Sequence, residues 1–148
     1  MTTRLFINVV EARDLPKVDI GTTGVADPYV KLFSAGETAE TRVIWNTSIP
    51  LWDEHFDFRA THSSQVIRCE LWDKDKGSDD DFMGWFQLHV SDVERLGPGG
   101  LLDAWYELQE DRRYASVLEG GLTFKIRGSV RLKARLKEVD DSVGVDKA

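Results

Sequence analysis

The chain contains a single cysteine, Cys69, among its 148 residues. One thiol cannot form an internal disulfide, whereas small secreted domains usually depend on several disulfides. Cys69 alternates with Ile67 and Leu71, as expected for a side chain on the buried face of a strand. We therefore expect a core residue of a protein kept in a reducing compartment, with a reactive thiol as the alternative.

The sequence also lacks a long apolar run. A membrane-spanning helix needs about 20 consecutive apolar residues, and no stretch of this chain approaches that length. The N-terminus has no charged segment followed by an apolar one, which is the pattern of a secretory signal. These two absences predict a soluble, cytoplasmic protein.

Positive charge is in the minority: 19 Lys and Arg stand against 26 Asp and Glu, which gives a net charge of −7. Nucleic acids attract basic surfaces, so no nucleic-acid partner is expected. Enzyme motifs are missing as well. There is no Gly-x-Ser-x-Gly elbow and no phosphate-binding Gly-rich loop, and His55, His62 and His89 are dispersed along the chain. We expect a protein that is not an enzyme.

Short segments of alternating apolar and polar residues recur along the chain, separated by Gly, Pro, Asp and Asn. The clearest lies within Gly128–Lys137, where four apolar residues alternate with basic ones. Eight such segments predict an all-β fold, an eight-stranded antiparallel sandwich. The expected strands are 5–10, 30–32, 41–44, 55–58, 67–71, 86–90, 105–108 and 128–137. Ser91 and Glu94 have the spacing of a capping box, which predicts a short helix near residues 91–96.

An acidic segment lies between residues 71 and 84 and contains five aspartates within nine positions. Asp73, Asp75 and Asp81 are spaced so that their carboxylates can converge on one hard divalent cation, which takes about six to eight oxygen ligands. A solvated acidic loop is the simpler alternative. An EF-hand does not fit, because its sixth position should be Gly and is Ser78, and its twelfth should be Glu and is Gly84.

A second loop places Asp19 and Asp27 around a Gly-rich turn between two apolar segments. The two loops together resemble the calcium-binding loops of the C2 domain family, the membrane-targeting β-sandwich modules of conventional protein kinases C and synaptotagmins. Asp27-Pro-Tyr-Val and Asp81-Phe-Met-Gly are similar to family signatures, and residues 46–56 resemble the family's Asn-Pro turn and the strand after it. Three separated motifs that match together are more specific than any one of them.

The resemblance implies one domain over residues 4–137 that holds two calcium ions, or three. The ligands that it implies are the side chains of Asp19, Asp27, Asp73, Asp75, Ser78 and Asp81 and the carbonyl oxygens of Val18 and Lys74. This sequence departs from the family in the longer stretch between Asp19 and Asp27 and in Ile49, which replaces the usual Asn before Pro50.

Few residues precede the first expected strand, so we expect the type II permutation of the family, with Gly128–Lys137 beside that first strand. Residues 138–148 are expected to form a disordered acidic tail, because they contain few apolar residues.

The implied function is calcium-dependent binding to anionic phospholipid membranes, phosphatidylserine first among them, by a cytoplasmic monomer that associates peripherally with the membrane. Ile20, Val25 and Gly77 are the expected lipid contacts, with little insertion because Gly77 has no side chain. Arg42, Arg131, Lys133 and Arg135 form a candidate basic face, for which a solvated strand surface is the alternative. The alternative function is a protein-interaction or scaffold module, with or without calcium.

Overall fold

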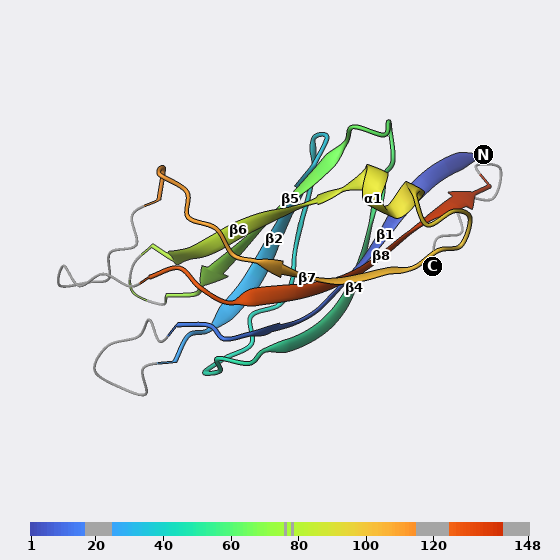
Figure 1. Cartoon of the computed structure of the whole chain (residues 1–148). Helices are drawn as coiled ribbons and strands as arrows, with labels where there is room; N and C mark the ends of the chain where they lie inside the picture. Colours follow the sequence, from blue (N-terminus) through green and yellow to red (C-terminus); the bar gives the residue numbers. More distant parts are fainter. Residues whose placement is uncertain (17–24, 76, 78, 115–124, 141–148) are drawn as a thin grey trace.

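Two four-stranded antiparallel sheets form a sandwich in the computed structural model of the chain (Figure 1). The structure describes residues 1–16, 25–75, 77, 79–114 and 125–140. In order across the first sheet lie β4 (Leu51–Arg59), β1 (Thr2–Arg13), β8 (Ser129–Val139) and β7 (Leu102–Glu107). In order across the second lie β3 (Glu37–Glu40), β2 (Pro28–Ser34), β5 (Val66–Asp73) and β6 (Asp81–His89). Within these residues the predicted all-β, eight-stranded antiparallel sandwich is confirmed.

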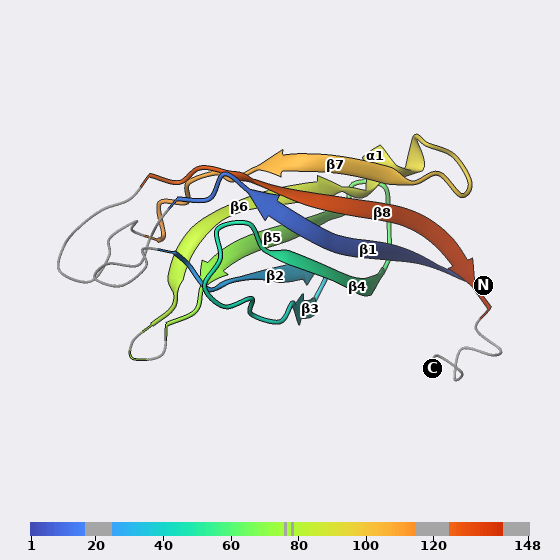
Figure 2. The ribbon, with the colours of Figure 1, turned by 90° about the horizontal axis from the view of Figure 1, so that it is seen from below.

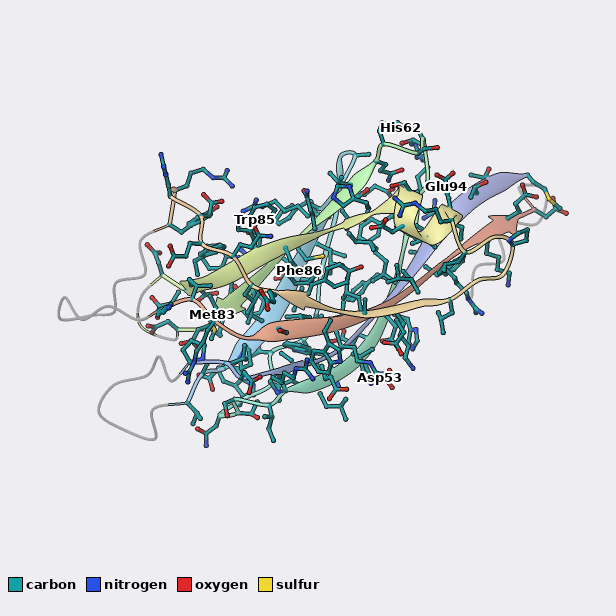
Figure 3. All side chains as sticks on the ribbon, in the orientation of Figure 1. Asp53, His62, Met83, Trp85, Phe86 and Glu94 are labelled. Carbon is teal, nitrogen blue, oxygen red and sulfur yellow. The ribbon has the colours of Figure 1, made fainter. Side chains whose placement is uncertain are left out.

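The core lies between the two sheets, where the apolar residues of the alternating segments meet. Along β6, Phe86 points between the sheets and is 1% exposed, while Trp85 points away from them (Figure 3). Cys69 on β5 is fully buried, as its alternation with Ile67 and Leu71 predicts. Burial raises the pKa of the Cys69 thiol, which keeps it protonated and poorly reactive.

The C-terminal strand β8 runs antiparallel to β1 along its whole length, from Thr2 opposite Val139 to Arg13 opposite Ser129. The C-terminal strand thus lies beside the first strand, as expected for the type II permutation. The type II assignment itself stays a prediction. Because β8 continues to Val139, regular structure extends two residues beyond the boundary expected at 137. Residues 141–148 of the expected tail lie outside the described residues.

The third strand was predicted at 41–44, and this is wrong: β3 is Glu37–Glu40. Ala35 and Gly36 both have positive φ, 47° and 86°, and form a tight turn that pairs β3 directly with β2. The ladder ends after Glu40, because the Val30 N–H donates to the Thr41 side-chain Oγ1 at 2.9 Å. Residues 41–44 continue beside β2 as irregular chain.

The predicted helix is present but begins earlier, as α1 (Val90–Glu94). Ser91 does not cap it, since the residue before the helix is His89 and its side chain makes no capping bond. Val90 and Val93, three positions apart, are both buried, and their packing sets the start of the helix.

The strand directions define two ends of the sandwich (Figures 1 and 2). At one end β1 and β5 finish and β2 and β6 begin, so both loops that resemble calcium loops belong there. The start of β1 and the helix α1 lie at the other end.

Candidate metal centre

Asp73 is the most enclosed of the predicted ligands that the structure describes. It is the last residue of β5 and only 1% exposed. In the sheet it pairs with Pro28 of β2 on one side and with Asp81 of β6 on the other. The end of β5 therefore brings a buried carboxylate between the two loops in which the sequence analysis places the metal.

Asp27 is tied directly to Asp73. The Asp27 backbone N–H donates to Asp73 Oδ1 at 2.8 Å, and the Lys74 N–H donates to the Asp27 carbonyl oxygen at 3.0 Å. The Asp27 carboxylate in turn accepts a hydrogen bond from the Asn46 backbone N–H at 2.6 Å. These bonds fasten three separate loops to one another around two carboxylates.

The loop after β5 is shaped by its own aspartates. Asp75 Oδ1 accepts from the Gly77 N–H at 3.0 Å, and the Asp75 N–H donates to Asp80 Oδ1 at 2.9 Å. The other Asp80 oxygen accepts from the Tyr29 hydroxyl and lies 3.8 Å from Lys74 Nζ. Burial, together with this bond to Asp80, raises the pKa of Tyr29. Asp80 thus folds the loop back toward β2.

The donors gathered at this end are carboxylate oxygens, which suit a hard cation such as calcium better than a soft metal. Asp27, Asp73, Asp75 and Asp81 belong to the described residues, whereas Val18, Asp19 and Ser78 lie outside them. In the described part of the chain, no group of three or more His, Cys, Asp or Glu side chains stands ready to hold a metal ion. The complete ligand set therefore stays a prediction.

Asn46 is a residue of this centre that the sequence analysis did not single out. Its φ is 58°, in the left-handed region that Asn tolerates better than most residues. This conformation accompanies the bond from its N–H to Asp27. The signal in the sequence was the resemblance of residues 46–56 to the family turn, but a backbone donor leaves no side-chain pattern to recognise.

A family model described as C2 domain matches residues 3–108. The chain belongs to the C2 domain family. C2 domains are membrane- or protein-interaction modules and are typically not catalytic. None of the helices among the described residues is long and apolar enough to cross a membrane.

Curated relatives resemble this C2 domain over most of its length. Ras GTPase-activating protein 4 of Mus musculus is 35% identical over 136 residues, which are 91% of this chain and 16% of that protein. The C2 and GRAM domain-containing protein At1g03370 of Arabidopsis thaliana is 32% identical over 123 residues, 83% of this chain and 12% of that protein. The chain thus spans less than a fifth of these relatives.

Solved structures share the fold. A C2 domain of plant Extended Synaptotagmin 1 superposes with a TM-score of 0.77 at 22% identity, over 95% of this chain and 98% of that one. At such identity the likeness shows the fold alone. A calcium-bound pair of C2 domains from Extended-Synaptotagmin 2 gives a TM-score of 0.74 at 26% identity, over 99% of this chain and 50% of that one.

The expected lipid contacts are only partly described. Ile20 lies outside the described residues, Val25 is half-buried and Gly77 is exposed. A Cβ added at Gly77 would have no atom within 4 Å, so this position points into open space, as expected for a loop tip.

The candidate basic face is divided in this C2 domain. Arg42 pairs with Glu54 of β4 at 3.3 Å, and β1 separates β4 from β8, where Arg131, Lys133 and Arg135 lie. Arg131 is bonded to Asp103 at 2.8 Å and to Glu11 at 2.9 Å. One strand therefore lies between β4 and the basic row of β8, and carboxylates pair with Arg42 and Arg131. The basic face itself stays a prediction.

Proposed function

We propose that this C2 domain binds anionic phospholipid surfaces, phosphatidylserine first among them, when calcium is present. It acts as a monomeric, non-catalytic cytoplasmic module that associates peripherally with the membrane. The observation that carries the proposal is the bond between Asp27 and the buried Asp73 carboxylate, with Asp81 paired on the other side of Asp73.

The aspartates would act through their charge. Asp27, Asp73, Asp75 and Asp81 place four negative charges at one end of the sandwich, and the predicted ligand Asp19 would add a fifth. These carboxylates repel an anionic membrane on their own. Two bound calcium ions would bring +4 against the −5 and remove most of this repulsion, and a third ion would make the local charge positive. The carboxylates hold the ions at the loop end, and Ser78 and the carbonyls of Val18 and Lys74 complete the proposed ligand set.

The comparisons support calcium as the ion at the level of the family. A calcium-bound neighbour, Extended-Synaptotagmin 2, shares the fold at 26% identity. The proposal concerns the C2 domain itself, because the chain covers only 16% of Ras GTPase-activating protein 4.

Asp75→Asn tests the proposal. Asp75 stands between Asp73 and Asp81 in the loop and is the carboxylate expected to bridge two ions, so its neutralisation should weaken calcium binding at least tenfold in calorimetry. Glu94→Gln is the matched control, since it removes one negative charge at the opposite end, on α1 (Figure 3), and should leave the affinity unchanged. Undiminished binding by Asp75→Asn would refute the site.

Vesicle co-sedimentation tests the partner. The wild-type domain should sediment with vesicles of phosphatidylcholine and phosphatidylserine when calcium is present, and not when it is chelated. A domain that binds calcium but never sediments would instead be a calcium-dependent protein-interaction module. Sedimentation that is indifferent to calcium would refute the proposed switch.

A further inference from the structure

Exposed apolar side chains lie on both sides of Asn46, the residue whose N–H donates to the Asp27 carboxylate. Trp45 is 51% exposed, Ile49 73% and Leu51 60%. Among the described residues, these are the exposed large apolar side chains at the candidate metal end of the sandwich. The others are Met1, Val66, Leu96 and Leu101, which precede β1, begin β5 or lie between α1 and β7, all at the opposite end.

Backbone hydrogen bonds hold this stretch in place on both sides of Asn46. The Ile44 N–H donates to the Pro28 carbonyl at 3.1 Å, and the Thr47 N–H donates to the Ala26 carbonyl at 2.9 Å. Nearer the tip, the Ile49 N–H donates to Thr47 Oγ1 at 3.0 Å. The exposure of Trp45 and Ile49 is therefore built into the loop rather than produced by a loosely held chain.

The chemistry around this stretch favours a lipid surface as its partner. Trp prefers the interface of a membrane, where its ring meets both apolar and polar groups. The Asn46 N–H joins the loop to Asp27 at 2.6 Å, so the apolar side chains flank the residue bonded to a predicted calcium ligand. An anionic bilayer complements both features, because its headgroups face the bound cations and its apolar region begins just below the headgroups.

We propose that Trp45 and Ile49 insert into the interfacial layer of an anionic bilayer when the neighbouring aspartates hold calcium. This inference rests on the proposed function and adds to it an anchor on the loop before β4. The sequence analysis expected little insertion from Ile20 and Gly77, and Trp45 and Ile49 provide apolar contact that those two positions were not expected to give.

A fluorophore at position 49 tests the insertion directly. Ile49→Cys can be labelled selectively with an environment-sensitive thiol probe, because Cys69 is fully buried and its pKa is raised. With calcium and vesicles of phosphatidylcholine and phosphatidylserine, the probe emission should shift to the blue and become shielded from an aqueous quencher. Leu101→Cys is the matched control, being 54% exposed at the opposite end, and its probe should not change.

Truncation provides a second measurement. Trp45→Ala and Ile49→Ala should each lower the calcium-dependent vesicle partition coefficient about tenfold, because each removes the contact of a large apolar side chain with the bilayer. Leu101→Ala should leave it unchanged. Calcium affinity measured without lipid should be the same in all three variants.

The outcomes separate the two proposals. If the wild-type domain does not sediment with these vesicles in calcium, both the proposed function and the insertion are overturned. If it sediments but the probe at position 49 stays accessible to the aqueous quencher, only the insertion is overturned, and membrane binding proceeds through other residues.

Discussion

At the scale of single residues, two glycines distinguish the energetic cost of backbone strain from the cost of overpacking. Gly84, in β6, has a φ of 127°, and an added Cβ would lie 2.7 Å from Leu108 Cβ and 3.0 Å from Ile126 Cγ2. Gly36, in the turn between β2 and β3, has a φ of 86° and nothing within 4 Å of an added Cβ. Both conformations disfavour a side chain, but only Gly84 leaves no room for one.

Gly84→Ala should therefore destabilise the domain by about 2–4 kcal/mol, the sum of backbone strain and overpacking. Gly36→Ala should cost about 1–2 kcal/mol, from strain alone. Urea unfolding gives both values. Equal losses in the two variants would contradict the close approach of Leu108 to β6.

Tyr106, which stacks on Phe86 with ring centroids 5.3 Å apart, links stability to alkaline pH. Burial, with a smaller effect of the Asp92 charge, raises the pKa of Tyr106 to about 12. A phenol in the unfolded chain has a pKa of about 10, so the unfolded state loses its proton first as the pH rises. The contribution of Tyr106 is complete below about pH 10 and is lost as the pH approaches about 12.

Tyr106→Phe should accordingly make the free energy of unfolding less dependent on pH in this range. Urea midpoints at about pH 9 and pH 11.5 for the wild type and the variant would measure the difference. In Tyr106→Phe the free energy of unfolding should still fall somewhat as the pH rises, because the pKa of Tyr29 is also raised. An identical slope in both proteins would contradict the role of Tyr106.

At the scale of elements, the end of β3 depends on one hydroxyl group. Thr41 is 5% exposed, and its Oγ1 accepts the Val30 N–H at 2.9 Å in place of a ladder bond. Thr41→Val keeps the shape of the side chain but leaves this buried donor without its partner, which should cost about 1–3 kcal/mol. Thr38→Val, at an exposed position of β3, is the control and should change the urea midpoint little. No loss in Thr41→Val would show that the irregular segment repairs the bond.

The chain that follows β7 packs on the outer face of β5 and β6, and residues 109–114 are called the strap. Gln109 forms a bridge with Trp85, and Asp111 pairs with Arg68 at 2.7 Å. Tyr114 then stacks on Phe82 with centroids 4.5 Å apart. Phe82 follows Asp81 directly, so the strap supports the strand end that presents this predicted ligand.

These elements show what the sequence could predict. The alternation of Val130, Leu132 and Ala134 predicted β8 well, because one face of that strand is buried along its length. The sequence failed at β3, where the ladder is ended by a side-chain hydrogen bond, and at α1, where buried valines override a capping pattern. The spacing of the aspartates predicted that the candidate ligands come from two loops at one end of the sandwich. The hydrogen bond from the Asn46 backbone to Asp27 could not be predicted, because it depends on tertiary contacts and not on the type of residue at position 46.

At the scale of the whole molecule, the domain is a sandwich with several aspartates at one end. A backbone hydrogen bond joins Asp27 to Asp73, and the pairing of β5 with β6 places Asp81 opposite Asp73. The backbones of these three residues therefore stay close while the domain is folded, and their like charges repel one another. Unfolding releases that repulsion. A cation held by these carboxylates in the native state alone must therefore stabilise the fold.

Calcium should raise the thermal midpoint of the domain by about 5–10 °C at 100 times its dissociation constant, since binding then contributes about 2.7 kcal/mol. Asp75→Asn should lose most of this shift, whereas Glu94→Gln should retain it. Magnesium should have a much smaller effect, because it requires a compact octahedron of about 2.1 Å bonds and gives up its water reluctantly. The carboxylates here come from separate loops and from a fixed strand end, an arrangement that suits the larger and more variable shell of calcium. Equal shifts from the two ions at equal concentration would contradict a calcium site and indicate non-specific screening of the acidic end.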